Sequence, residues 1–364
     1  MITGRDPESH EIPGVKRYCI EPYEGLLKAA FDAKNALKNL MKGKGQRPAE
    51  TGKGINTNSP LGIRFLWSKI LRSIRREKPD AVHIQWLWDY YPEQVSYIAK
   101  LAAGGVRFFY TFHNSKPHEG FAQGIKDFFK ALHPHLTLCF THSEFDKKEV
   151  TRLYGIPGDK VRVLKMFNPL AVFPKEKKLD PRMVVLLFFG YIRQYKGLDR
   201  LIGLLGSDDP VYDNVKLHIL GSVSDKDRGV YEELIGKNGR KQNIEWDIGY
   251  AGPEKVSEAF AHADVLVLPY RDATQSAVIP LAYYTRTPVI VNDVGGLSEN
   301  VSDGRTGFVL KEPFEERFTA LLKRENIKEL LGEMSGNALS YYNDNLETEK
   351  VIDSYIKMIS SFIR

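Results

Sequence analysis

Short unbroken apolar runs alternate along the chain with longer segments in which apolar residues recur every three or four positions. Residues 184–189 and 265–268 form two of the clearest runs, and residues 198–205 have the helical spacing. Short runs of this kind are typical of strands buried on both faces of a parallel sheet. Runs in the first half predict further strands at residues 80–86, 106–112, 136–141 and 161–165. The alternation predicts an α/β fold built on parallel sheets.

A polar turn separates a predicted strand from a predicted helix in the second half. Pro269 ends the run at residues 265–268, and a turn of small and polar residues, 271–276, leads into a helix expected to begin near Ser276. The start of a helix leaves backbone N–H groups unpaired and carries partial positive charge, so this turn is suited to binding phosphate. Residues 287–296 repeat the plan of a strand followed by a glycine turn.

A second turn of this kind follows the run at residues 184–189. Gly190 opens it, and Arg193 and Lys196 lie within it, immediately before the predicted helix at residues 198–205. Two cations at this spacing can close on a diphosphate while the helix start supplies N–H donors. Together the two turns predict a site for a nucleotide diphosphate.

Five segments of the second half resemble, in order, the donor domain of the retaining glycosyltransferases of family four, which have the GT-B fold. They are FGYIRQYKG, LHILGS, ADVLVLPY, TPVIVNDVGGLSE and DGRTGFVL, all within residues 183–310. The resemblance implies two Rossmann-like domains whose parallel sheets face a central cleft, with Arg193 and Lys196 acting on the donor's pyrophosphate. The donor-binding residues that we predict on this basis are Gly190, Tyr250, Asp272, Thr274, Gln275, Ser276, Ala277, Val278 and Glu299. For Glu299, a cap on its own helix stays open as the alternative.

The chain departs from the family at its hallmark, Glu-x7-Glu, whose carboxylates contact the donor sugar and the nucleotide ribose. Ala273 and Leu281 stand at those two places. Because a subset of the family resembles this chain in carrying Ala-Thr-Gln-Ser here, we interpret the site as a variant in which Asp272 is a candidate substitute. A degenerate, inactive donor site is the alternative. On the first interpretation, Ala277→Glu is expected to abolish donor binding and Leu281→Glu to be tolerated.

Polar residues follow three predicted strands of the first half, at residues 113–114, 141–143 and 167–168. In open parallel sheets, ligands bind beyond the carboxyl ends of the strands. Family-four enzymes often place a histidine at such an end, and His113 matches it, which implies a catalytic role beside the reacting sugars; a histidine that only caps the strand is the alternative. Asn114, His118 and Ser143 are the predicted acceptor-binding residues, with loop support for His118 and helix capping for Ser143 left open.

The length of 364 residues predicts two domains. We expect an N-terminal acceptor-binding domain at residues 1–174, a nucleotide-sugar-binding domain at 175–345, and a final helix within 346–364 that packs back on the first domain. Residues 1–8 resemble the end of the second strand of a GT-B domain. The first βα unit is therefore expected to be missing, through truncation or trimming.

Composition adds modest constraints. The 52 Lys and Arg against 46 Asp and Glu give a net charge of +6, which fits an anionic substrate or membrane surface and is too mild to indicate nucleic acid. Cys19 and Cys139 lie far apart in apolar runs, which favours buried free thiols in a reducing compartment. No spacing of histidines or cysteines indicates a metal site. No apolar run approaches the roughly 18 residues of a membrane span.

A basic amphipathic segment at residues 65–76 leaves peripheral membrane docking open beside simple core packing. The expected localisation is cytoplasmic, with contact to the cytoplasmic face of the membrane as an open addition.

These features predict a retaining glycosyltransferase that moves a sugar from a nucleotide diphosphate sugar to a hydroxyl of a glycan or lipid-linked glycan. Arg193, Lys196 and helix N-termini can stabilise the departing diphosphate without a metal, and no cofactor is expected besides the donor substrate. Two alternatives remain: a catalytically inactive sugar-nucleotide-binding partner, and a sugar-nucleotide epimerase of the same architecture.

Overall fold

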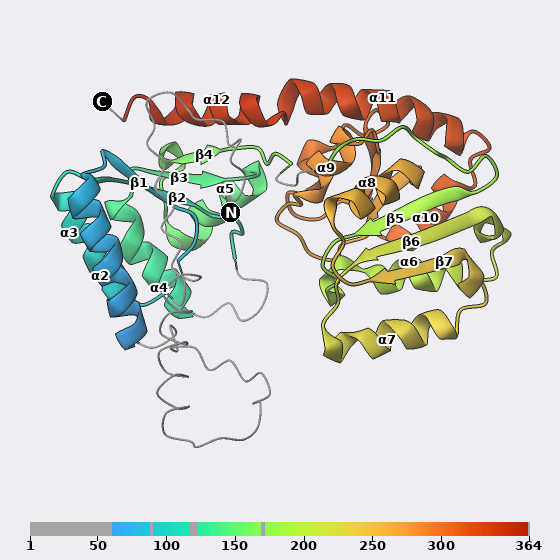
Figure 1. The fold of residues 1–364 in the computed structure, drawn as a ribbon, viewed down its shortest axis with the longest axis horizontal. Helices are drawn as coiled ribbons and strands as arrows, with labels where there is room; N and C mark the ends of the chain where they lie inside the picture. Colours follow the sequence, from blue (N-terminus) through green and yellow to red (C-terminus); the bar gives the residue numbers. More distant parts are fainter. Residues whose placement is uncertain (1–59, 88–89, 117–122, 169–171, 363–364) are drawn as a thin grey trace, which may run out of the picture.

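The computed structural model describes residues 60–87, 90–116, 123–168 and 172–362, which form two α/β domains side by side (Figure 1). One contains a four-stranded sheet of order β1-β2-β3-β4, and the other a six-stranded sheet of order β10-β9-β8-β5-β6-β7. All pairings between these strands are parallel. The predicted fold class of two parallel sheets is confirmed. The expectation of a missing first unit falls on residues 1–59, outside the described residues.

Short strands and helices alternate in the first domain. The strands are β1 (Ala81–Ile84), β2 (Arg107–Thr111), β3 (Leu138–Thr141) and β4 (Val161–Val163). The helices are α2 (Pro60–Glu77), α3 (Pro92–Ala103), α4 (Gln123–Leu132) and α5 (Glu144–Tyr154). Each strand lies inside one of the four runs predicted from the sequence and is shorter than that run.

The second domain repeats the alternation at greater length. Its strands are β5 (Val184–Phe189), β6 (Val215–Gly221), β7 (Ile244–Ile248), β8 (Val265–Leu268), β9 (Val289–Asn292) and β10 (Gly307–Leu310). Its helices are α6 (Leu198–Leu205), α7 (Asp225–Gly236), α8 (Pro253–His262), α9 (Val278–Tyr284) and α10 (Phe314–Leu322), followed by α11 (Ile327–Asn345) and α12 (Thr348–Ile359). The predicted bounds of β5, α6 and β8 match the structure.

Both faces of the larger sheet are buried. Leu186 and Phe188 of β5 pack into the core on one face, and Leu187 between them packs into the core on the other. Successive side chains of a strand point to opposite faces. Because each face is covered, every position of this run must be apolar, and this produces the unbroken pattern in the sequence.

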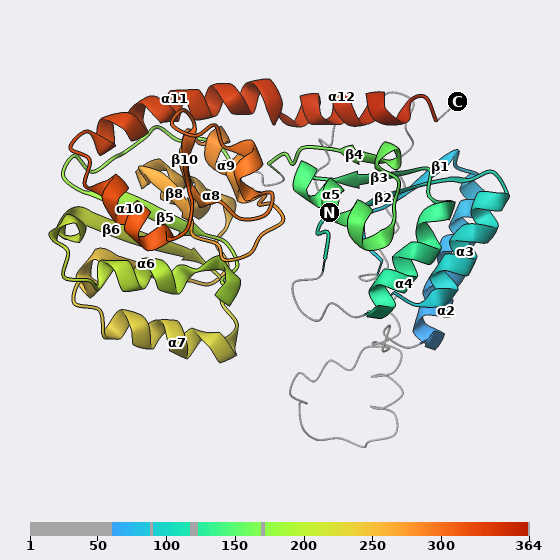
Figure 2. The same cartoon turned by 180° about the vertical axis from the view of Figure 1, so that it is seen from behind.

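The last two helices run end to end along one side of both domains (Figures 1 and 2). α11 packs on the second domain through Met334 and Ala338. α12 lies on the first domain, where Tyr355 and Met358 pack against Phe109 and Phe140. The chain therefore returns to cover a face of the first sheet.

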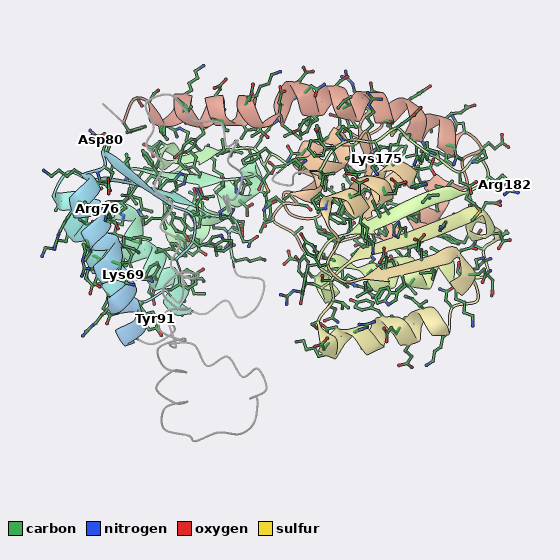
Figure 3. The ribbon with its side chains drawn as sticks, viewed as in Figure 1. Lys69, Arg76, Asp80, Tyr91, Lys175 and Arg182 are labelled. Atoms are coloured by element: carbon green, nitrogen blue, oxygen red, sulfur yellow. The ribbon has the colours of Figure 1, made fainter. Side chains whose placement is uncertain are left out.

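The basic helix α2 uses its apolar side for packing. Trp67 is buried and stacks on Tyr97 of α3, with ring centroids 5.5 Å apart. Lys69 and Arg76 lie along the outer edge of the domain on α2 (Figure 3). The apolar side is therefore part of the core, which was the alternative to membrane docking.

Candidate functional site

The larger sheet contains a point at which its chain order reverses. β5, β6 and β7 extend in one direction from this point, and β8, β9 and β10 extend in the other, with β5 paired to β8. The turns that follow β5 and β8 leave the sheet at neighbouring carboxyl ends. Ligands of open α/β sheets bind in the crevice at such a switch point.

The turn after β5 brings a lysine over the strand end. The N–H of Gly190 donates to the carbonyl oxygen of Leu220, so the turn begins against β6. A Cβ atom added to Gly190 would lie 3.5 Å from Nζ of Lys196, which places the ammonium group directly beside this backbone. A short 3-10 helix, Gln194–Lys196, then leads into α6.

Burial affects the charge of this lysine. Desolvation, with a further contribution from Arg193, lowers the pKa of Lys196 to about 8. Its Nζ lies 5.5 Å from the centre of the Tyr270 ring, and the guanidinium of Arg193 lies 4.7 Å from the centre of the Tyr191 ring. The side chain of Arg193 is exposed. The two predicted cations thus share one turn, one half-buried and one open to solvent.

The turns after β5 and β8 are packed against each other. Gly197 has a φ of +70°, and a Cβ atom on it would lie 2.2 Å from the carbonyl oxygen of Pro269, so this contact requires glycine. The N–H of Arg271 donates to the carbonyl oxygen of Tyr195 at 2.7 Å. The guanidinium of Arg271 also forms a bidentate pair with Asp199 at 2.7 Å for each bond. These contacts hold the predicted phosphate turns together.

The start of α9 differs slightly from the prediction. Ala277 is the N-cap, α9 begins at Val278, and the N–H of Val278 donates to Oγ of Ser276 at 3.4 Å. Asp272 is exposed, whereas Ser276, Ala277 and Val278 are half-buried. The residues at the start of this helix are therefore partly accessible to solvent.

The two hallmark positions belong to the core. Ala273 is 3% exposed and Leu281 1% exposed, and both pack in the apolar cluster beneath the turn. A carboxylate at Leu281 would be buried among apolar side chains, which is strongly unfavourable. The expectation that Leu281→Glu would be tolerated conflicts with this packing.

The turn after β8 also contacts the first domain. Oγ1 of Thr274 donates to Oδ1 of Asn114 at 2.8 Å, and Nε2 of Gln275 donates to the carbonyl oxygen of His113 at 3.2 Å. The structure thus brings together residues predicted for the donor side and residues predicted for the acceptor side. The side chains of Thr274 and Gln275 are thus used in contacts between the two domains.

Glu299 binds the start of a helix in the other domain. Its carboxylate accepts hydrogen bonds from the N–H groups of Glu144 and Phe145, each at 2.7 Å. Ser143 caps the same helix, α5, by accepting from the N–H of Asp146 at 3.0 Å. Helix capping, one of the roles left open for Ser143, is what the structure shows. The bond from Glu299 to α5 was not predicted, because it joins residues far apart in the sequence.

A pair of histidines lies at the carboxyl edge of the smaller sheet. Nδ1 of His113 lies 3.1 Å from Nε2 of His142, and Nε2 of His113 lies 3.0 Å from Oε1 of Gln85. The Trp86 ring stacks on His113 with centroids 4.9 Å apart. Burial, with the nearby His142, lowers the pKa of His113 to about 4, so the ring is neutral at pH 7. His142 belongs to the strand-end group predicted at residues 141–143, without a role of its own, and Gln85 was not predicted.

A cavity of about 110 Å³ lies behind His113 and Asn114. Its wall is largely aromatic: Trp86, Tyr90, Tyr110, Phe112, Phe129 and Tyr154 line it, together with Thr111. The cavity therefore adjoins His113 and Asn114 at the edge where an acceptor was predicted.

Not every predicted site residue is placed in this cluster. Tyr250 is 89% exposed at the end of β7. His118 lies outside the described residues. Within the described part of the chain, no three His, Cys, Asp or Glu side chains are grouped to hold a metal ion, and no helix has the length and apolar character to cross a membrane.

Comparison with known proteins agrees with this architecture. Two α/β domains with parallel sheets, joined by a returning C-terminal helix, define a GT-B fold. The family profile described as glycosyl transferases group 1 matches residues 172–338, and that described as glycosyltransferase family 4 matches residues 38–166. The chain belongs to the group 1 glycosyltransferases of family four.

Two characterised relatives illustrate the similarity. The chain is 28% identical over 172 residues to the lipopolysaccharide glucosyltransferase WaaG of Escherichia coli, in a match covering 47% of the chain and 44% of that protein. It is 31% identical over 174 residues to the D-inositol 3-phosphate glycosyltransferase of Paenarthrobacter aurescens, covering 44% of the chain and 42% of that protein. The matched region is therefore less than half the length of either relative.

A solved structure shares the fold over more of the chain. HepE of Anabaena, crystallised with UDP-glucose, superposes with a TM-score of 0.66 at 15% sequence identity, and the match covers 84% of each chain. At this identity the likeness concerns the fold alone.

Proposed function

We propose that the protein transfers a sugar from a nucleotide diphosphate sugar to a hydroxyl acceptor, with retention of configuration and without a metal ion. The acceptor in this proposal is a glycan or lipid-linked glycan. The observation that carries the proposal is the packing of the cationic turn, with Arg193 and Lys196, against the turn that opens α9, at the switch point of the sheet.

The positive charge at the switch point of the larger sheet supports a sugar-transfer reaction. A sugar leaves its donor when the departing diphosphate is stabilised, and preorganised cations and N–H groups provide this more effectively than water does. Arg193 and Lys196 supply positive charge. In the first turn of α9, the N–H groups of Val278 and Ile279 donate to Ser276 and Pro280 has no N–H, so the N–H donors in this proposal come from the preceding turn, residues 275–277. In this proposal the donor diphosphate lies between the two cations and that turn. The naming of WaaG as a glucosyltransferase and the UDP-glucose complex of HepE support trying uridine diphosphate sugars first.

The position of the histidine supports an acceptor on the opposite side. The carbonyl oxygen of His113 is bonded to Gln275 of the donor turn, so the histidine lies at the contact between the domains. In the proposal its ring faces the sugar, and the aromatic cavity behind Asn114 receives part of the acceptor. A cytoplasmic enzyme acting at the membrane surface is consistent with the exposed basic residues of α2.

One observation favours a second candidate, a protein that binds the nucleotide sugar without turning it over. Ala273 and Leu281 are buried apolar residues where the family has carboxylates, so the donor sugar and ribose lack two usual ligands. An epimerase of the same architecture would instead interconvert donors.

The test is incubation of the full chain with UDP-, GDP- and ADP-sugars and a panel of glycan acceptors, followed by mass spectrometry and by NMR of the anomeric proton. A new glycoside with the donor's configuration supports the proposal. Binding without products supports the second candidate, an interconverted donor indicates an epimerase, and an inverted product contradicts retention. In His113→Ala, turnover should fall strongly while donor affinity and melting temperature stay near wild type. Parallel loss of stability and activity would indicate a purely structural histidine.

A further inference from the structure

The hydrogen bonds of His142 determine where its proton lies. Nδ1 of His142 is 2.8 Å from the carbonyl oxygen of Leu164, and a carbonyl oxygen can only accept. Nδ1 therefore carries the hydrogen. In a neutral imidazole only one nitrogen is protonated, so Nε2 of His142 is left with a lone pair. That nitrogen faces Nδ1 of His113 at 3.1 Å.

The protonation of His142 in turn determines where the proton of His113 lies. His142 is buried, and desolvation lowers its pKa, so the neutral form is favoured. Its Nε2 can then only accept, and Nδ1 of His113 must donate. Since burial also lowers the pKa of His113, this ring is neutral as well, and its hydrogen is committed to Nδ1. The reverse order of protons would require an imidazolium at buried His142, which burial disfavours.

We propose that His142 is a positioning residue that fixes His113 as the Nδ1–H tautomer, so that Nε2 of His113 accepts a hydrogen bond from a sugar hydroxyl. The nearest polar group to Nε2 is the amide of Gln85, at 3.0 Å. The oxygen and nitrogen of such an amide are assigned from the hydrogen-bond network. Because Nε2 of His113 holds a lone pair in this tautomer, the Gln85 amide must point its NH₂ group, the donor, toward that nitrogen. Gln85 is exposed, so an incoming hydroxyl can replace it.

This assignment selects the kind of group that His113 can recognise. A lone pair attracts an O–H donor and repels a phosphate oxygen, which has no hydrogen to donate. His113 is therefore assigned to a hydroxyl of the donor or acceptor sugar, and the diphosphate is left to Arg193 and Lys196. The consequence for turnover rests on the proposed function, whereas the tautomer itself does not.

The direct test is long-range ¹H–¹⁵N NMR on the full chain labelled at histidine, at pH 7.5, because the ¹⁵N shifts distinguish the two tautomers. The His113 signals are assigned by their loss in His113→Gln. The expected result is an Nδ1–H tautomer at both His113 and His142. An Nε2–H tautomer at His113 in the wild type overturns the inference, whether or not the protein has transferase activity.

Variants of His142 then test whether the tautomer of His113 depends on His142. His142→Phe removes the acceptor, so His113 should shift toward the Nε2–H tautomer; His142→Gln, which can place an amide oxygen near the lost Nε2, should restore Nδ1–H. With an active enzyme, kcat of His142→Phe should fall about tenfold, the upper range for one neutral hydrogen bond, with KM for the donor little changed. His262→Gln, at an exposed histidine on α8, is the matched control and should change neither readout. An unchanged His113 tautomer in folded His142→Phe contradicts the role of His142.

Discussion

Lys196 has a charge that depends on what occupies the site. Desolvation and Arg193 lower its pKa to about 8, so an added diphosphate should raise the pKa again and draw a proton onto the lysine. Affinity for a nucleoside diphosphate should therefore fall as the pH rises through about 8. Calorimetry at several pH values, in buffers of different ionisation enthalpy, would reveal the proton uptake.

Substitution of either cation tests the same clamp. Arg193→Ala or Lys196→Ala should weaken binding of the diphosphate by roughly 1.5–3 kcal/mol, the range for charge-assisted hydrogen bonds. Lys196→Arg is the control for the pH effect, because arginine stays protonated and its affinity should not decline near pH 8. If both alanine variants bind like the wild type, the diphosphate lies elsewhere.

Buried histidines should make the protein sensitive to acid. His83 bonds to the hydroxyls of Tyr355 at 2.6 Å and Thr111 at 2.8 Å, and burial, with His142 nearby, lowers its pKa from 6.5 to about 4. The unfolded chain then binds more protons than the folded one between these pH values. Stability is present above pH 6.5 and is lost as the pH falls toward 4, by an amount for His83 on the order of 3 kcal/mol.

Melting temperatures between pH 7 and 5 check this, because most carboxylates titrate below that window. The wild type should lose stability across it, and His83→Gln, although less stable at pH 7, should lose less. A wild-type melting temperature that does not change between pH 7 and 5 would contradict the neutral, buried state of His83.

Some site residues could be predicted from local sequence and others could not. Arg193 and Lys196 share one turn between a strand and a helix, so their spacing alone indicated a joint site. His113 and His142 follow the neighbouring strands β2 and β3, and the parallel pairing of these strands brings two ring nitrogens within 3.1 Å. Glu299 meets α5 because two domains pack together. Such pairings depend on tertiary contacts, for which the sequence has no periodic signal.

At the scale of elements, α9 includes a position in the core, Leu281, and begins at a proposed binding position, Ala277. Leu281 is 1% exposed within the core, so Leu281→Glu should destabilise the protein by several kcal/mol, the usual effect of burying an unpaired charge. Ala277 is half-buried at the N-cap, where a carboxylate is favourable to the helix. Ala277→Glu should therefore fold normally and lose donor affinity through crowding and repulsion of phosphate.

Thermal denaturation and calorimetry with the nucleotide distinguish the two variants. The prediction requires a low melting temperature for Leu281→Glu and a near wild-type value for Ala277→Glu. Full donor affinity in Ala277→Glu would show that phosphate does not bind at the start of α9. A stable Leu281→Glu would show that this part of the core can open to water.

Strands could be predicted from the sequence where every side chain of the strand is buried. The runs that became β5 and β8 are apolar at every position because both faces of the sheet are covered, and their ends were marked by Gly190 and Pro269. The predicted strand at residues 106–112 is longer than β2, because Phe112 is buried beyond the last paired residue of the strand. Apolar character reports burial, and burial continues past the last paired residue, although the N–H of Phe112 still donates to the carbonyl oxygen of Phe140 on β3.

At the scale of the whole molecule, two of the connections between the domains differ in kind. One is the returning helix α12, whose Tyr355 and Met358 cover Phe109 and Phe140 of the first sheet. The other is the polar contact around the donor turn, from Thr274, Gln275 and Glu299 to the first domain. The first buries apolar surface and should be permanent. The second consists of a few hydrogen bonds, those of Glu299 exposed and those of Thr274 and Gln275 part-buried, so we expect that it can break while the fold stays intact.

Glu299 is the residue through which this second connection can be tested. Its carboxylate accepts two N–H groups at 2.7 Å at the positive end of α5, an exposed contact whose charge–dipole part is worth about 0.3–1 kcal/mol. Glu299→Ala should therefore leave the melting temperature almost unchanged while shifting the domains toward a more open arrangement. Small-angle X-ray scattering should record a larger radius of gyration for this variant, and high salt should produce part of the same change in the wild type, because exposed charge interactions are screened.

Asp293→Ala is the matched control, since that carboxylate bonds to Ser298 within its own domain at 2.7 Å and should not affect the scattering. Equal scattering from wild type and Glu299→Ala would mean that the remaining contacts hold the domains closed without this carboxylate.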